Sequence, residues 1–185
     1  MSPDMGDDSI DGIDTKEPAF GFPAKCITEE TKAEAELLGY TIVDPPSVVS
    51  THLTEVIKKH AHILLGREET KQLVDHLEED YPILVKEVTP EPLSIGDIQK
   101  VLANLLRENI SIRNLPIIFE TLADFAQMTT DTTLLTEYVR QALAVQITNQ
   151  YVHENKSLKV IGVSPKVEEL IMSNIQQTEH GNYLS

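Results

Sequence analysis

The 185-residue chain is poor in cysteine, in aromatic residues and in positive charge, and each shortage excludes a class of protein. Its single cysteine, Cys26, excludes an internal disulfide framework and any zinc site built from several thiolates. Trp is absent and aromatic residues make up 5% of the chain, so a core has to be mainly aliphatic. Fifteen basic residues against thirty acidic ones give a formal charge of −15. That charge opposes binding to nucleic acid, because such affinity depends on Lys and Arg neutralising phosphates.

Long apolar runs are missing as well. A membrane-spanning helix needs about 20 predominantly apolar residues, and runs such as LGYTIV are far shorter. The first residues, MSPDMGDDSIDGID, are acidic and lack the apolar region of a signal peptide. We therefore expect any membrane attachment to lie outside this sequence, and we interpret both of its ends as cuts through a larger structure.

Hydrophobic residues make up 41% of the chain, and their spacing along the sequence predicts an α+β protein that is predominantly helical. Six acidic residues among the first 17 predict a loop at the N-terminus. A strand–helix–strand unit follows over residues 18–44, with AFGFPAKCI and YTIVD as its strands. Thr28 is the predicted cap of its helix and Gly39 the predicted end. Ser47 is the predicted cap of the next helix.

Residues 67–150 have an almost purely helical pattern, and their short connections predict a compact bundle. Ser94 and Asp97 stand at capping-box spacing before an apolar run. The stretch DTTLLTEYVRQALAVQITNQY, with Asp131 as its cap, is the predicted longest helix.

The pattern changes again after Tyr151 and predicts the start of a second α/β subdomain. YVHENKSLKVIGVS is typical of two strands around a polar turn. SPKVEELIMSNIQQ predicts a helix with Ser164 as its cap and Pro165 at its first position, and no further element is expected in TEHGNYLS.

Three of the six histidines, His52, His60 and His62, lie within eleven residues of one predicted helix. His52 and His60 are about 80° apart around that helix but about 12 Å apart along it, and His60 and His62 are about 200° apart. Because a helical two-histidine metal site needs i, i+4 spacing on one face, we expect no metal site. The sequence also lacks a Gly-rich phosphate loop and a G-x-S-x-G nucleophile elbow, so we expect no catalytic residue and no cofactor. Cys26 is expected to be a buried, inert thiol in the apolar segment AKCI. A small hydrolase that uses His52 and His60 with nearby carboxylates is the remote alternative.

An apolar concentration stands out in EPAFGFPA, which holds two of the four Phe residues of the chain. In an extended segment, Phe20 and Phe22 face the same side. One interpretation is that both rings fill the core of the strand–helix–strand unit. The other is a shallow apolar depression with Glu17 at its mouth, which is the usual anatomy of a contact hot spot.

Three stretches together resemble a known family: EPAFGFPAKCITEETKAEAELLGYTIVDPPSVVSTHLTEVIKKHAHILL, LLRENISIRNLPIIFETLADFA and LLTEYVRQAL. They are similar to the cytoplasmic region of the FlhA family of flagellar type III export-gate proteins, over about residues 17–150. The export gates of virulence type III secretion systems are related and form the first alternative, but THLTEVIKKHA and LLTEYVRQAL favour the flagellar branch.

The resemblance implies a docking platform on the cytoplasmic face of the bacterial membrane and no enzymatic activity. Its expected partners are flagellar export chaperones carrying substrates, other export-apparatus proteins and further copies of the chain in a ring. It also implies four regions: 1–44, part of an inserted small subdomain; 45–65, a returning helix of the first subdomain; 66–144, an all-helical subdomain; and 145–185, the start of a truncated α/β subdomain. The implied chaperone-binding dimple consists of Pro3, Glu17, Phe20, Phe22, Val43, Val48 and Thr51.

Overall fold

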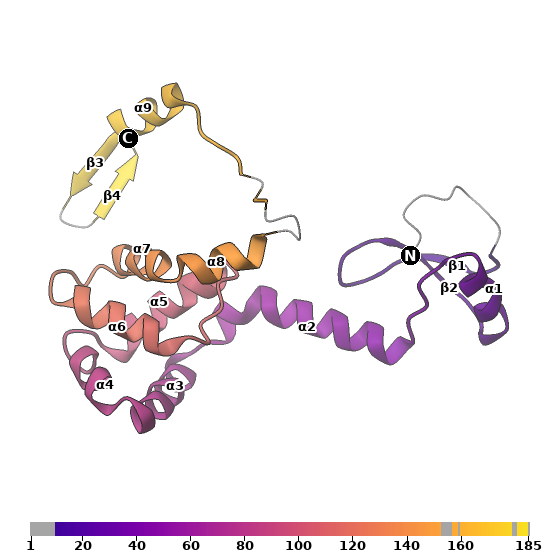
Figure 1. Cartoon of the computed structure of the whole chain (residues 1–185), viewed down its shortest axis with the longest axis horizontal. Coiled ribbons are helices and arrows are strands. Elements are labelled where there is room, and N and C mark those ends of the chain that lie inside the picture. The colour runs from indigo at the N-terminus through magenta and orange to yellow at the C-terminus, as the bar shows by residue number, and fades with distance from the viewer. Residues whose placement is uncertain (1–9, 153–156, 159, 179–180, 185) are drawn as a thin grey trace. The chain divides into compact units, whose positions relative to one another are not determined.

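The computed structural model describes residues 10–152, 157–158, 160–178 and 181–184. The chain divides into two compact units, Met1–Leu143 and Ala144–Ser185. Helices dominate the described residues, and their strands form two small antiparallel sheets (Figure 1). The predicted class, α+β and predominantly helical, is confirmed.

The first unit begins with two strands, β1 (Ile13–Lys16) and β2 (Pro23–Cys26), which pair antiparallel with Ile13 opposite Cys26. The Lys25 ammonium lies 3.5 Å from the Asp14 carboxylate on the opposite strand and donates to the Ile10 carbonyl at 3.3 Å. The predicted N-terminal loop is therefore wrong for residues 13–16. Acidic composition predicted a loop, but backbone pairing with β2 orders this segment, and the acidic Asp14 finds its cation across the ladder.

A short helical segment follows, made of the 3₁₀ turn η1 (Glu29–Thr31) and helix α1 (Lys32–Leu37). Thr28 is the cap residue of η1, although its side chain makes no capping hydrogen bond. Gly39 has a φ of +80° just after the helix, as a terminating glycine should. The predicted strand YTIVD is wrong, because residues 40–44 form no strand. β-Branched residues favour extended backbone, but a strand also needs a partner edge.

Helix α2 (Pro45–Leu64) is the longest helix among the described residues, at 20 residues. Its cap is Asp44, whereas the sequence predicted Ser47, so that prediction is wrong. The Asp44 carboxylate accepts from the Ser47 N–H at 3.2 Å and from the Ser47 hydroxyl at 2.6 Å, which places both prolines of the DPP sequence in the first turn. These hydrogen bonds from Ser47 lower the pKa of the Asp44 carboxyl. Proline suits that turn because its missing N–H has no partner there in any case.

The helical core of the first unit is built around α5 (Ile95–Arg107), which contacts α2, α3 and α7. The other helices are α3 (Arg67–Asp80), α4 (Pro82–Val88), α6 (Leu115–Ala126) and α7 (Thr132–Ala142). Fully buried side chains from these helices fill the core: Val88, Ile98, Val101, Leu102, Leu105, Ile118, Phe119, Leu122, Leu135 and Val139. The predicted capping box at α5 is confirmed, with Ser94 accepting from the Asp97 N–H and Asp97 accepting from the Ser94 N–H.

The predicted helix over residues 131–151 is interrupted at Leu143 and forms α7 and α8 (Ala144–Tyr151). Asp131 caps α7 as predicted, accepting from the N–H groups of Thr133 and Leu134. Leu143 adopts φ −87° and ψ 8°, outside the helical region, while its side chain stays 1% exposed. Periodicity continues through this position, so the local pattern carries no sign of the break, which coincides with the boundary between the two units.

The second unit contains α8, α9 (Pro165–Ser173) and a hairpin of β3 (Ile175–Thr178) and β4 (Gly181–Leu184), with Ile175 opposite Leu184. The strands predicted over residues 151–164 are wrong where the structure describes them, since Tyr151 ends α8 and residues 157–158 and 160–164 form no strand. The helix after Ser164 is confirmed but ends at Ser173. The end of the predicted helix forms β3, and part of the TEHGNYLS segment forms β4. Pairing of the two strands gives hydrogen-bond partners to backbone N–H and C=O groups that lie outside the helix.

Within the described part of the chain, no helix combines the length and the apolar character that crossing a membrane requires.

Candidate docking surface

The hairpin that joins β1 to β2 carries the most distinctive local geometry of the described chain. We call residues 17–22 the Glu17 loop. The Glu17 N–H donates to the Phe22 carbonyl at 2.8 Å, and the Gly21 N–H donates to the Glu17 carbonyl at 2.8 Å. These two backbone hydrogen bonds join the start of the loop to its end. Gly21 has a φ of +74°, which a residue without Cβ adopts at little cost.

The two phenylalanines of this loop lie side by side on the surface. Their ring centroids are 6.1 Å apart and the rings are tilted by 42°, within the range of favourable aromatic pairs. Phe20 is 58% exposed and Phe22 49% exposed, so the interpretation that they fill the core of this chain is wrong. The predicted extended segment is wrong as well, because residues 18–20 form a turn and the strand begins only at Pro23.

The Glu17 carboxylate turns back into the loop. Its two oxygens accept from the N–H of Ala19 at 2.8 Å and from the N–H of Phe20 at 2.7 Å. The sequence predicted Glu17 at the rim of an apolar depression but missed these two partners. The sequence does contain a signal for these hydrogen bonds. Glu17 supplies an acceptor, Pro18 follows it, and Gly21 stands four residues after Glu17, which is the pattern of a single capped helical turn.

The remaining predicted site residues fall into a second group at the start of α2. Val43 is 50% exposed, Val48 is half-buried, and Thr51 is exposed one helical turn after Val48. Pro3 lies outside the described residues. The union of this group with the phenylalanine pair in one depression stays a prediction.

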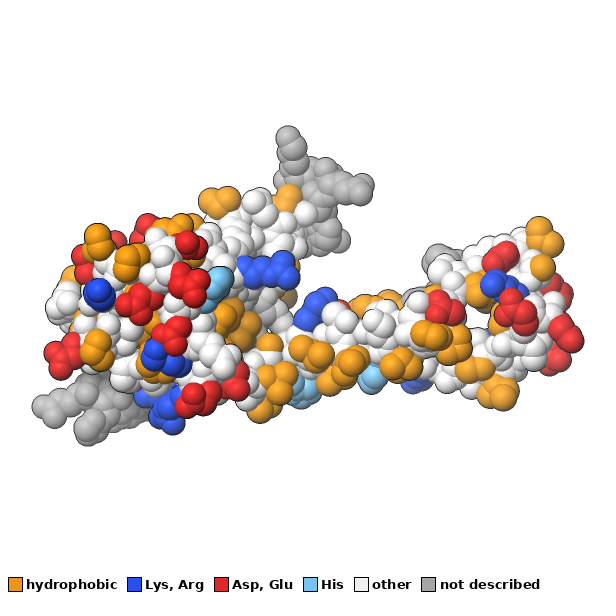
Figure 2. Space-filling view, turned by 90° about the horizontal axis from the view of Figure 1, so that it is seen from below, with side chains coloured by type: hydrophobic (Ala, Val, Ile, Leu, Met, Phe, Trp, Pro, Cys, Tyr) orange, Lys and Arg blue, Asp and Glu red, His pale blue; other side chains and the backbone are white. Residues whose placement is uncertain are grey.

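Helix α2 itself presents apolar side chains along its length, and Figure 2 shows them in a row. Val49, Leu53, Val56, Ile57, Ile63 and Leu64 are between 39% and 68% exposed. The sequence predicted a broad apolar side on this helix, and none of its residues is buried by the described chain.

The predictions for the histidines and the cysteine can be compared with the structure only at the described positions. Among the described residues, no group of three or more His, Cys, Asp or Glu side chains is arranged to hold a metal ion. His153 and His180 lie outside that part of the chain. Cys26 is exposed at the end of β2, opposite Ile13, so its predicted burial is wrong.

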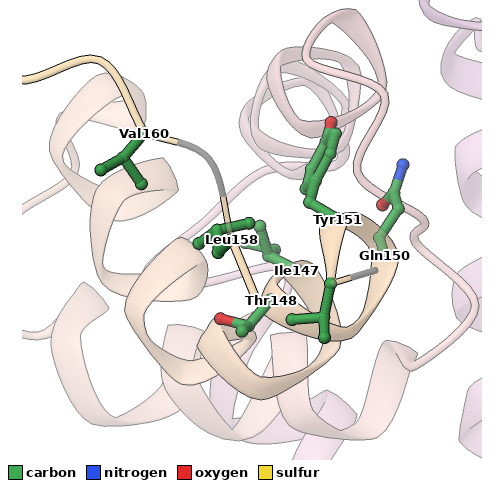
Figure 3. Close-up of a pocket in the computed structure, with 7 residues that line it drawn as sticks. Ile147, Thr148, Gln150, Tyr151, Leu158 and Val160 are labelled. Atoms are coloured by element: carbon green, nitrogen blue, oxygen red, sulfur yellow. The ribbon is translucent and has the colours of Figure 1, made fainter. Parts of the chain in front are cut away.

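A hollow of about 530 Å³ lies in the second unit between α8 and the segment that follows it (Figure 3). Its lining is mainly aliphatic and aromatic: Ile147, Thr148, Gln150, Tyr151, Val152, Leu158 and Val160. The sequence does not predict this hollow, because its lining residues fall in a long predicted helix and two predicted strands.

Comparison with known proteins decides the family. A model of the FHIPEP family matches residues 1–185, the whole chain. The chain belongs to the FHIPEP family. Among its FHIPEP relatives is the flagellar biosynthesis protein FlhA of Bacillus subtilis, 66% identical over 185 residues, with 100% of this chain and 27% of that protein covered. FlhA of Borreliella burgdorferi is 42% identical over 94% of this chain and 25% of that protein.

Solved structures share the fold of this FHIPEP chain. The Chlamydia pneumoniae CdsV protein matches with a TM-score of 0.81 and 33% identity, over 89% of this chain and 48% of that one. Nonameric EPEC SctV-C matches with a TM-score of 0.75 and 29% identity, over 100% of this chain and 56% of that one. The chain thus spans about a quarter of the FlhA sequences that it matches and about half of the CdsV and SctV-C structures.

Proposed function

We propose that this chain is part of a docking platform for flagellar type III protein export, which binds export chaperones loaded with their substrates. The identity of 66% to a flagellar FlhA, against 33% to CdsV, favours the flagellar branch over the virulence export gates. The work of the platform is reversible binding and assembly, without a chemical reaction of its own.

The proposed binding site is the dimple formed by Pro3, Glu17, Phe20, Phe22, Val43, Val48 and Thr51. One observation carries this proposal: two adjacent aromatic rings, both about half exposed, stand on a loop that internal hydrogen bonds hold in place. Exposed aromatic side chains on a rigid support are the usual anchors of protein–protein interfaces, because they contribute large apolar area at a small cost in conformational entropy. An aliphatic side chain of the chaperone is the proposed occupant.

The proposed place of each region follows the family. Residues 1–44 belong to an inserted small subdomain, 45–65 to the returning helix of the first subdomain, 66–144 to an all-helical subdomain and 145–185 to the start of an α/β subdomain. The change of unit after Leu143 supports the last of these boundaries to within one residue.

Ring assembly and location are proposed from the relatives. Cryo-EM structures describe EPEC SctV-C as nonameric and EscV as a nonameric cytosolic domain from the type III secretion system. CdsV has been solved in complex with CdsO. We extend these properties to this chain as a ring on the cytoplasmic face of the bacterial cell membrane, in contact with other export-apparatus proteins.

Titration calorimetry of the chain with a flagellar chaperone carrying its substrate tests the proposal. The wild type should bind, while Phe20→Ala and Thr51→Ala should weaken binding and stay folded. Ile83→Ala is the matched control, because Ile83 is 75% exposed on α4, outside the proposed site. Equal affinity of Phe20→Ala and wild type would contradict the proposed site, and binding of a virulence chaperone in preference to a flagellar one would favour the alternative gate.

A further inference from the structure

The Glu17 loop contains one complete turn of helix with a cap at each end. Glu17 occupies the cap position, Pro18 the first position, and Gly21, with its φ of +74°, the position after the turn. The Gly21 N–H donates to the Glu17 carbonyl four residues earlier, which is the hydrogen bond of a single α-turn. The sequence EPAFG therefore encodes its own start and stop signals.

The side chain of Glu17 has the hydrogen-bonding pattern of an N-cap. It accepts from the N–H groups two and three residues later, at 2.8 and 2.7 Å. Asp131 accepts from the same two relative positions at the start of α7, at 2.8 and 3.4 Å. N–H groups at the beginning of a helical turn have no partner in the turn itself, so a carboxylate there fixes the backbone through charge-assisted bonds.

We infer that Glu17 is a positioning residue for docking: its carboxylate holds the turn that presents Phe20 beside Phe22, and affinity depends on that capping rather than on attraction between its charge and the partner. This inference rests on the proposed function, since it assumes that the phenylalanine pair is the contact. Both carboxylate oxygens already accept hydrogen bonds within the loop, and the second of these is to the N–H of Phe20 itself. The side chain is thereby directed toward the backbone of the anchor residue.

Two substitutions separate capping from charge. Glu17→Ala removes both. Glu17→Asn removes the charge and keeps a side-chain oxygen of the kind that caps helical turns well. Glu29→Ala is the control for charge, because it removes the same charge from an exposed carboxylate whose ion pair with Lys32 lies outside the loop.

The amide spectrum of the free 185-residue chain provides the first readout. Glu17→Ala should move the amide signals of Ala19 and Phe20, Glu17→Asn should bring them back toward wild type, and Glu29→Ala should leave them in place. Unmoved signals in Glu17→Ala would overturn the inference without reference to any partner.

Binding to the loaded flagellar chaperone provides the second readout. We expect Glu17→Ala to bind about fivefold more weakly, the size of a lost cap, and Glu17→Asn to restore most of the affinity. Binding by Glu17→Asn as weak as by Glu17→Ala, together with a salt dependence that both variants lose, would show a direct charge contact and overturn the inference. Wild-type affinity in Phe20→Ala would overturn the proposed docking site itself, while moved amide signals in Glu17→Ala would still support its hold on the turn.

Discussion

Truncation of a phenylalanine should have opposite consequences at two positions of this chain. Phe20 is 58% exposed on the Glu17 loop, whereas Phe119, on α6, is 0% exposed in the core. A fully enclosed Phe side chain buries about 200 Å². The exposed fraction of Phe20 leaves about 115 Å² for a partner to cover, which at about 25 cal/mol per Å² corresponds to about 3 kcal/mol of binding free energy.

We therefore expect Phe20→Ala to raise the Kd for a loaded chaperone by roughly a hundredfold if the partner encloses the ring. Its free energy of unfolding should fall by about 1 kcal/mol, the value of one aromatic pair. Phe119→Ala should lower the free energy of unfolding by about 3–5 kcal/mol, because it leaves a cavity in the core. Its Kd should stay near the wild-type value under conditions where it is folded.

Urea unfolding followed by circular dichroism gives the stabilities, and calorimetry gives the affinities. If Phe20→Ala lost as much stability as Phe119→Ala and its affinity loss disappeared once the folded fraction was taken into account, Phe20 would be a core residue and the reasoning would be refuted.

Three further predictions concern the caps and α2. The hydrogen bond from the Ser94 hydroxyl lowers the pKa of the Asp97 carboxyl in the folded chain. The stability that this bond contributes is therefore present above the unfolded pKa of about 3.9 and is lost as pH falls through the lower folded pKa. Asp97→Asn should flatten the acid side of a plot of unfolding free energy against pH, and an unchanged plot would contradict this. Gly21→Ala should destabilise the loop by about 1–2 kcal/mol through its positive φ alone, since no atom lies within 4 Å of the added Cβ, and the amide exchange of residues 17–22 should report faster opening. Ile57→Ser on α2 should lower the free energy of unfolding of this chain by only about 1 kcal/mol, because about half of the Ile57 surface is exposed, and a loss of about 3 kcal/mol in urea unfolding would show that the residue is packed.

The elements that the sequence predicted well are those whose signals are local. The capping box of Ser94 and Asp97, the cap at Asp131 and the terminating Gly39 all depend on residues within one turn. The cap of α2, which is Asp44 and not Ser47, is a local error, and the other errors in the fold concern pairing and breaks. The segment YTIVD has the composition of a strand but no partner strand. The segment of β1 has the composition of a loop but pairs with β2. Leu143 ends α7 although the helical periodicity of the sequence continues past it.

The candidate site shows the same division. The concentration of Phe20 and Phe22 was visible in the sequence, and the structure adds that they meet through a capped turn instead of an extended strand. The place of Glu17 at the rim of the depression stays a prediction, and the structure adds that its carboxylate accepts hydrogen bonds from the turn that carries Phe20. The exposure of Cys26 could not be predicted from its apolar neighbours, because burial depends on packing between elements, which the tetrapeptide AKCI does not specify.

Site-specific photo-cross-linking tests the docking claim most directly. A benzophenone side chain in place of Phe22 keeps an aromatic group on the Glu17 loop, and the same group in place of Ile83 is the matched control on α4. We predict that irradiation with a loaded flagellar chaperone gives a cross-linked product from position 22 and none from position 83, and that excess unlabelled chain competes it away. Cross-linking from position 83 alone, or equally from both positions, would contradict the assignment of docking to the phenylalanine pair.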